Sequence, residues 1–337
     1  MKLNVKSLSV LLVFQLLLAL GIFYGKQLTS PSNSQDLIVY EALEEIKEIA
    51  ITDDSDSSVL LLFRDNEWLI SNENDFPADT DKINNFLESI NSLSSQSVSA
   101  VAVTEGARNR FKVADDEFSK RIKLTGVTNT SEELYLGSSP GLDRVHLRKG
   151  GEDGIFVVKF PTYEASSSSS SWLDKSILQV PSNEIVYIKS GNIILERKLE
   201  SGAIKSEEEV EKNTSELKLV EGLGSWQATR SDDQNRPVNQ EAAQEIPKQL
   251  ERLRFTNLSD IDLSNKPDSE EVLVLMLQLR DETEIKYILN KYEGNYYLRS
   301  SDWDRIFSIG SYTAERLIES ISKEVLFPAE PLAPNEE

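Results

Sequence analysis

The stretch VLLLFRDNEWLISNENDFPADTDKINNFLESINSL, residues 59–93, decides the fold. It opens with a β-rich apolar run, turns near Asp65 and Asn66, and continues as a second short apolar run that contains Trp68. Asp79 or Thr80 then offers an N-cap for a helix. The apolar side chains that follow share one helical face: Ile83, Phe86, Leu87, Ile90 and Leu93. We therefore expect strands followed by one amphipathic helix.

Four short segments with strand-like patterns follow this helix and are separated by glycine-containing turns. They are residues 121–124, 133–136, 144–148 and 155–160. Successive short strands joined by tight turns predict an antiparallel meander, which the preceding helix is available to cover. A further helix is expected over residues 312–324. The fold class is therefore α+β.

The same succession of features recurs further along the chain, which indicates a duplicated unit. The matches are residues 45–49 with 184–188, residues 59–61 and Trp68 with residues 217–219 and Trp226, the helix positions Ile83, Phe86, Ile90 and Leu93 with Ala243, Ile246, Leu250 and Leu253, residues 145–148 with 296–299, and residues 155–156 with 306–307. The spacing drifts, as it does when insertions fall in loops, and residues 192–215 are the largest candidate insertion. We predict two tandem repeats of an antiparallel sheet with a covering helix, at residues 37–165 and 172–327.

Six consecutive serines, residues 166–171, separate the two predicted units. Such a run is typical of a flexible linker or surface loop. A modification site is the alternative interpretation, and nothing adjacent supports it. The proline-rich residues 328–337 are expected to form an extended, mobile tail.

The first 36 residues predict a membrane anchor. Lys2 and Lys6 precede a charge-free stretch of 19 residues, 7–25, which as a helix spans about 28 Å, close to the thickness of the bilayer's hydrocarbon core. A cleaved signal peptide is the competing interpretation, but it would have a shorter apolar core and a small-residue cleavage site. The lysines predict that residues 1–6 are cytoplasmic and that the rest is exported, with residues 26–36 as a spacer.

The composition restricts what the predicted exported part of the chain can bind. The chain has 337 residues and a formal net charge of −21, with no conspicuous run of basic residues, so we expect no nucleic-acid partner. The absence of cysteine removes disulfides, thiolate metal ligands and cysteine nucleophiles. The sequence leaves the oligomeric state open.

No set of residues forms a recognisable reactive site. Strand alternation places His146 on the same face as Arg144 and Arg148. Because no second histidine and no cysteine accompanies it, His146 is a poor metal ligand, and we expect it at the surface or rim. The carboxylates of residues 53–56 predict a solvated loop, with weak divalent-cation binding as the alternative. Trp68 and the equivalent Trp226 are expected in the core rather than stacked on a ligand. We therefore assign no catalytic, cofactor-binding or metal-binding residues, expect no enzyme activity and no cofactor, and leave the ligand-binding residues open.

The order of several short motifs resembles the domain-of-unknown-function 4340 family. These motifs are residues 67–70, 76–79 before a helix, 133–137 before a Ser-Pro-Gly turn, the strand at 144–148 and residues 172–174. The resemblance covers nearly the whole chain and extends to the N-terminal anchor, whereas the six serines depart from it. It implies a bacterial cell-envelope protein of the kind found with ABC transporters of the gliding-motility and auxiliary type. It implies no reaction.

These observations favour a single-pass protein of the bacterial cytoplasmic membrane whose body lies outside the cytoplasm. The first hypothesis is an accessory subunit that contacts an ABC-type permease and ATPase. The second is a binding protein for envelope glycan or peptide, which would use a groove between the two repeats. A hydrolase is the third, and it would need a cleft with two carboxylates about 5–10 Å apart, or His146 beside a nucleophile.

Overall fold

The structure is a computed structural model that describes residue 15 and residues 45–96, 98–200, 222–230 and 237–327. The chain divides into two compact units, residues 1–173 and 174–337. Among the described residues, no helix is long and apolar enough to cross a membrane. The predicted cytoplasmic segment 1–6, the anchor 7–25 apart from Gln15, the spacer 26–36 and the tail 328–337 lie outside the described residues.

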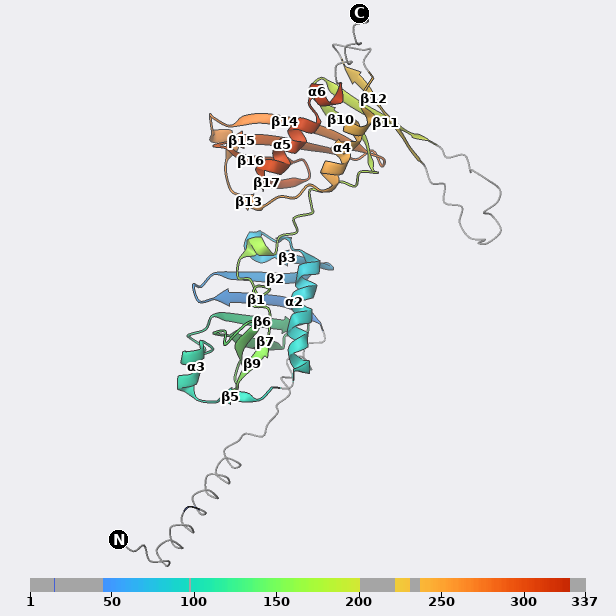
Figure 1. The fold of residues 1–337 in the computed structure, drawn as a ribbon. Helices are drawn as coiled ribbons and strands as arrows, with labels where there is room; N and C mark the ends of the chain where they lie inside the picture. The colour runs from blue at the N-terminus through green and yellow to red at the C-terminus, as the bar shows by residue number, and fades with distance from the viewer. Residues whose placement is uncertain (1–14, 16–44, 97, 201–221, 231–236, 328–337) are drawn as a thin grey trace, which may run out of the picture. The chain divides into compact units, whose positions relative to one another are not determined.

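The first unit is one antiparallel sheet whose strands lie in the order β4-β3-β2-β1-β6-β7-β8-β9-β5 (Figure 1). Its strands are β1 (Ile46–Asp53), β2 (Ser58–Arg64), β3 (Glu67–Ile70), β4 (Phe76–Pro77), β5 (Ala100–Ala102), β6 (Lys120–Gly126), β7 (Ser131–Leu136), β8 (Arg144–Lys149) and β9 (Ile155–Lys159). Its helices are α2 (Thr80–Ser92), α3 (Glu105–Phe111) and the short 3-10 turns η1 (Ser71–Glu73), η2 (Leu93–Ser95) and η3 (Ser169–Ser171).

Helix α2 begins where its sequence predicts and covers one face of the first sheet (Figure 1). The Asp79 carboxylate accepts a hydrogen bond of 3.0 Å from the backbone N–H of Lys82, which caps the helix start. Ile83, Phe86 and Ile90 are buried on the helix. Alternation along the strands places a matching set of buried aliphatic side chains on the sheet, so this side holds the core. We call it the helix face, and the opposite side the far face.

The second unit follows the same chain path, in the order β12-β11-β10-β14-β15-β16-β17-β13 (Figure 1). Apart from β4, each strand of the first sheet has a counterpart at the same position. The strands are β10 (Ile185–Ser190), β11 (Ile193–Glu200), β12 (Gly222–Arg230), β13 (Asn257–Ser259), β14 (Glu270–Leu279), β15 (Glu284–Tyr292), β16 (Asn295–Ser300) and β17 (Trp303–Ile309). The helices are α4 (Gln240–Glu251), α5 (Ser311–Ser320), α6 (Lys323–Leu326) and the 3-10 turn η5 (Leu263–Asn265). The predicted α+β class with antiparallel sheets and few helices is confirmed.

The two units differ in the connection that precedes the strands β6 and β14. In the first unit, 17 residues, 103–119, join β5 to β6, and they include the seven-residue helix α3. In the second unit only 10 residues, 260–269, join β13 to β14, and their one helical turn is η5. The shorter connection therefore lacks the equivalent of α3.

The six serines lie inside the first unit, and the boundary between the units follows Leu173. The hydroxyl of Ser167 donates a 2.6 Å hydrogen bond to Asp53, and the carbonyl of Ser166 accepts one of 2.8 Å from the indole of Trp172. The Trp172 ring is fully buried and meets the ring of Phe86 on α2 edge-on at 5.6 Å. A run that we expected to behave as a flexible linker thus leads directly into a core side chain, which holds it against the sheet.

Candidate functional site

On the first unit's far face, Arg148 is buried beneath the connection that contains α3. Its side chain is 1% exposed. The guanidinium donates hydrogen bonds to the Val113 carbonyl at 2.6 Å and to the Asp115 carboxylate at 2.5 Å, and it lies 4.4 Å from the centre of the Tyr135 ring. The hydrogen bond from Arg148 holds the pKa of Asp115 below its usual range. Burial, together with the Glu133 carboxylate, raises the pKa of Tyr135 to about 12.

The predicted surface or rim position of His146 is wrong, and Arg148 on the same strand face is buried as well. His146 is only 7% exposed, and its ring stacks on the Phe111 ring with 4.0 Å between centroids. Sequence alternation correctly places both residues on one face, but it cannot reveal that α3 and the segment after it cover that face. The buried cation is tolerated because carbonyls and a carboxylate satisfy its donors.

The nearest hydroxyl does not make His146 a catalytic base. Its Nδ1 lies 3.1 Å from the Ser138 hydroxyl oxygen but only 2.7 Å from the Ser138 carbonyl oxygen. Since the carbonyl can only accept, Nδ1 carries the proton and donates it there. A protonated Nδ1 cannot take a proton from the hydroxyl, so this contact fixes the ring orientation.

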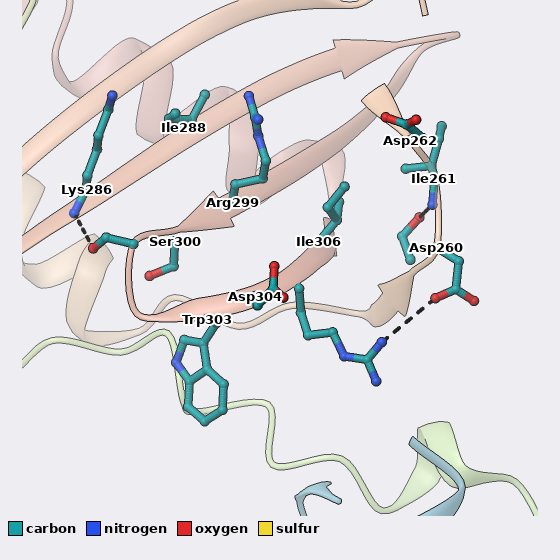
Figure 2. A pocket seen from close by; sticks show the side chains of 13 residues that line it. Asp260, Ile261, Asp262, Lys286, Ile288, Arg299, Ser300, Trp303, Asp304 and Ile306 are labelled. Carbon is teal, nitrogen blue, oxygen red and sulfur yellow. Dashed lines mark hydrogen bonds and ion pairs between the residues drawn. The ribbon is translucent and has the colours of Figure 1, made fainter. Parts of the chain in front are cut away.

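On the second unit's far face, the corresponding surface is open and forms a pocket of about 550 Å³ (Figure 2). Arg299 occupies the Arg148 position, because Arg148 pairs with Tyr135 and Ile155 while Arg299 pairs with Ile288 and Ile306. The pocket combines an apolar floor with charged groups of both signs and one indole. Its lining is Ser259, Asp260, Ile261, Asp262, Lys286, Ile288, Arg299, Ser300, Ser301, Trp303, Asp304, Arg305 and Ile306.

The basic side chains of the pocket project from the sheet. Figure 2 shows Lys286, Ile288 and Arg299 extending in the same direction from β15 and β16. Arg299 donates a long hydrogen bond of 3.4 Å to the Asn290 side chain. In the part of the chain that the structure describes, no carboxylate pairs with Arg299 or Lys286. Both cations are exposed and are available to a ligand.

Two of the pocket's acidic residues, Asp260 and Asp262, lie in the connection between β13 and β14, and each has a partner. A carboxylate oxygen of Asp260 lies 4.0 Å from a guanidinium nitrogen of Arg305 (Figure 2). The Asp262 carboxylate accepts hydrogen bonds from the Ser264 hydroxyl at 2.5 Å and from its backbone N–H at 3.0 Å. These bonds, that of the hydroxyl first, lower the pKa of Asp262. Asp262 therefore orders its own loop and Asp260 lies near Arg305 of β17, whereas Lys286 and Arg299 face the open space.

The other candidates from the sequence have structural roles. Asp53 accepts hydrogen bonds from Ser167 and from the backbone of Ser55 and Ser57, and the Ser167 bond is the main reason why its pKa is lowered. Trp68 and Trp226 are both buried, as expected. Within the described ranges, no group of three or more His, Asp or Glu side chains is placed to hold a metal ion.

The sequence did not reveal a second buried arginine, Arg197 on β11. It is 5% exposed, donates to the Ile185 carbonyl at 2.7 Å and lies 4.6 Å from the Trp226 ring centre. Burial and, to a lesser extent, repulsion from Arg280 lower the pKa of Arg197 to about 10. Arg197 is thus an internal brace on the helix face. It does not contribute to the pocket.

The sequence also did not identify the pocket residues Lys286, Arg299 and Trp303. Two signals were present: the match of residues 145–148 with 296–299, and the shorter connection at 260–269. Together they indicate that the two units share a chain path and that the second unit lacks one covering segment.

The fold and the pocket define an α+β protein with two antiparallel sheets of the same chain path, one of which has an open, mixed-charge far face. The family model described as "Domain of unknown function (DUF4340)" matches residues 68–274, which begin in β3 and end in β14. The chain belongs to this family. No curated protein and no solved structure matches it.

Proposed function

We propose that this protein is a non-catalytic binding subunit of the bacterial cell envelope that serves an ABC-type transporter. The observation that carries the binding role is the open far face of the second sheet, with its pocket of about 550 Å³. This volume lies within the range of pockets that bind small molecules or short segments of a partner.

Binding is favoured over catalysis by the roles of the reactive side chains. The His146 ring is stacked and its Nδ1 donates to a carbonyl. Asp53 and Asp262 are held in turns by serine hydrogen bonds. Because a general base or nucleophile has to reach the substrate, groups committed in this way are poor candidates for chemistry.

The transporter partner and the location outside the cytoplasm are supported by the sequence. Residues 7–25 have the length and composition of a membrane anchor with lysines on its N-terminal side. The resemblance to the family adds the association with ABC transporters. An anchored body with a pocket is suited to hold a segment of the permease or of its cargo close to the membrane.

A pull-down from native membranes tests the transporter role. The C-terminally tagged chain is solubilised in mild detergent and captured, and the eluate is identified by mass spectrometry, with a tagged chain of residues 1–36 as the matched control. We expect a permease and its ATPase in stoichiometric amounts with the full chain and not with the control. Recovery of the chain alone, under conditions that preserve other membrane complexes, overturns the transporter role.

The orientation has its own test. A reporter that fluoresces only in the cytoplasm is fused after residue 40 and, separately, before residue 1. We expect fluorescence from the N-terminal fusion alone. Fluorescence from the fusion after residue 40 overturns the proposed location outside the cytoplasm.

A free binding protein for envelope glycan or peptide is the second candidate. The pocket of the second unit favours it, because Trp303 beside Arg and Asp side chains offers both stacking and hydrogen bonding. Isolation of the chain without a transporter, together with ligand binding that depends on the pocket, would select this candidate.

A further inference from the structure

The geometry points to the far-face pocket of the second unit as a docking site for a short peptide segment of a partner protein. The segment would present one main-chain carbonyl and, two residues later, an aspartate side chain, both to Arg299. This inference rests on the proposed function as a binding subunit and specifies the ligand class for its pocket.

The first unit contains the template for such a complex. There Arg148 donates from Nε to the Val113 carbonyl at 2.6 Å and from Nη2 to the Asp115 carboxylate at 2.5 Å. Phe111, two residues before Val113, stacks on the ring of His146. A stretch of five residues, 111–115, thus satisfies one arginine and covers one neighbouring ring.

The second sheet repeats the receiving half of this arrangement. Arg299 takes the place of Arg148, and Ile306 that of Ile155, in the same strand register. Tyr297 takes the place of His146, so a ring again precedes the arginine by two residues and faces the same side. The equivalent of residues 111–115 is missing because the connection at 260–269 is seven residues shorter than that at 103–119.

The charges favour an acidic group at this position. Lys286 stands on the same face as Arg299 and projects with it into the pocket (Figure 2). Asp260 and Asp262 on the opposite rim are held by Arg305 and Ser264. An incoming carboxylate therefore meets two cations, on β15 and β16, and Asp304 on β17 is a carboxylate of the sheet that also lines the pocket. An arginine and a carboxylate form strong, oriented hydrogen bonds.

A peptide is favoured over a glycan because Arg148, at the position equivalent to Arg299, already binds a peptide segment of its own chain. Its two principal acceptors are a peptide carbonyl and an aspartate two residues apart. The apolar floor made by Ile288 and Ile306 accepts an aliphatic side chain such as that of Val113. A neutral sugar would leave the charges of Lys286 and Arg299 without a partner.

Photo-crosslinking with a peptide copied from the first unit tests the inference. The probe is acetyl-Phe-Lys-Val-Ala-Asp-amide, the sequence of residues 111–115, with a benzophenone on the aromatic ring. It is irradiated with the full-length protein, and the labelled residues are mapped by mass spectrometry. We expect labelling on β16 and its neighbours in residues 284–309, suppressed by excess peptide without the benzophenone.

Two changes check the contact with Arg299. Arg299→Gln in the protein, and asparagine for the aspartate of the probe, should each lower the labelling about tenfold, because each removes one partner of a charged hydrogen bond. The probe change leaves the protein intact and therefore excludes misfolding as the cause. Arg316→Gln, at an exposed arginine on α5, is the control and should label as the unmodified protein does.

Several results would overturn the inference. Labelling confined to the first unit, or unchanged by Arg299→Gln and by the asparagine probe, shows that the pocket is not the peptide site. Absence of peptide labelling, with an N-acetylglucosamine oligomer bound in an Arg299-dependent way, identifies a glycan site. If the pull-down recovers a transporter but the peptide does not label the pocket, this inference is wrong and the proposed function still holds. Pocket labelling without a transporter keeps the inference and selects the free binding protein.

Discussion

The two sheets follow one chain path, yet their far faces have opposite environments. Arg148 and Arg299 hold the same register position, but the first is 1% exposed and the second is exposed. The difference lies in the connection before β6 and β14, which contains α3 in the first unit only. One covering segment therefore decides whether a polar sheet face becomes interior or stays available for binding.

The helix faces of both units are covered, but by different segments after the last strand of each sheet. In the first unit the chain continues into the serine run and places Trp172 against Phe86 of α2. In the second unit it continues into α5, whose Glu315 accepts a hydrogen bond from Tyr296 of β16. Here both units complete the core by different means, which makes the open far face of the second unit the exception.

The largest effect is expected from Arg148→Met. The change removes the donors to Val113 and Asp115 and leaves the Val113 carbonyl buried without its partner, so the free energy of unfolding of the first unit should fall by about 3 kcal/mol. Arg299→Met, the matched change in the second unit, should cost less than about 0.5 kcal/mol because Arg299 is exposed. Hydrogen exchange of peptides from β7–β8 and β15–β16, read by mass spectrometry, measures both.

Equal losses at Arg148 and Arg299 would break the comparison. They would mean that the arginine stabilises the sheet itself, whatever covers it. A loss at Arg148 that exceeds the loss at Arg299 by less than about 1 kcal/mol would have the same meaning, since contributions of single interactions vary by that amount.

Phe111→Ala should have the next largest effect. It removes the ring that stacks on His146 and packs against the cluster of Ala107, Val113 and Tyr135. Because Phe111 is partly buried, we expect a loss of about 2 kcal/mol, below the range for a fully buried phenylalanine. The loss should appear as faster hydrogen exchange in β8 and in residues 105–119.

Tyr163→Ala is the control for Phe111→Ala, since Tyr163 is 79% exposed and lies in the same unit. It should leave the exchange of β8 unchanged. If both variants behave alike, the connection with α3 does not stabilise the far face, and the contrast between the two units loses its physical cause.

Much of the strand order that the two units share could be predicted from the sequence, because the matched residues are core positions. The matched strands β1 and β10, the matched tryptophans of β3 and β12, helices α2 and α4, and the pairs β8 with β16 and β9 with β17 all occupy equivalent places. Core positions keep their apolar character and their period of 2 or 3.6, whichever loops join them.

One of the matches, that of residues 59–61 with residues 217–219, did not identify the strand equivalent to β2. The strand before β12 is β11 (Ile193–Glu200), which falls within the stretch 192–215 assigned to an insertion, while residues 217–219 lie outside the described residues. Ile193, Leu195 and Arg197 alternate as the buried positions of β11. An arginine at a buried position hides the alternation, because its partners are carbonyls that the sequence does not indicate.

The pocket around Arg299 could not be predicted from local sequence patterns, for a related reason. Arg148 and Arg299 have similar sequence neighbourhoods, and only the distant connections at 103–119 and 260–269 distinguish them. Burial of a strand residue depends on what another part of the chain places over it. A site created by a missing cover therefore requires the tertiary structure.

Ser167→Ala tests how the serine run, residues 166–171, is held in the first unit. Its effect should be smaller than that of Phe111→Ala. The Ser167 hydroxyl donates to Asp53 and is the main cause of that residue's lowered pKa. Its loss should cost about 1 kcal/mol at pH 7 and speed exchange in residues 166–173. Because the folded pKa is lowered, the stabilisation is complete above the ordinary value of 3.8 and disappears as the pH falls from 3.8 through the folded pKa.

Ser170→Ala is the matched control, because the Ser170 hydroxyl meets only another serine hydroxyl, that of Ser168, in the described part of the chain. It should have little effect at any pH. A Ser167→Ala effect that persists below the folded pKa of Asp53 would show that packing of the serine run, rather than the charged hydrogen bond, holds it in place.

The smallest effect is expected from Ile288→Tyr. This change tests the ring beside the arginine separately from the covering segment, since both enclose Arg148 in the first unit. It gives the second sheet the ring that Tyr135 supplies in the first, but not the covering segment. If the ring attracts the guanidinium, Arg299 should lie over it and stabilise β15–β16 by about 0.5 kcal/mol. Ile288→Leu keeps an apolar floor without a ring and should leave hydrogen exchange unchanged. Identical exchange in both variants would mean that the ring alone does not hold the arginine, and that the carbonyl and carboxylate of a covering segment are required.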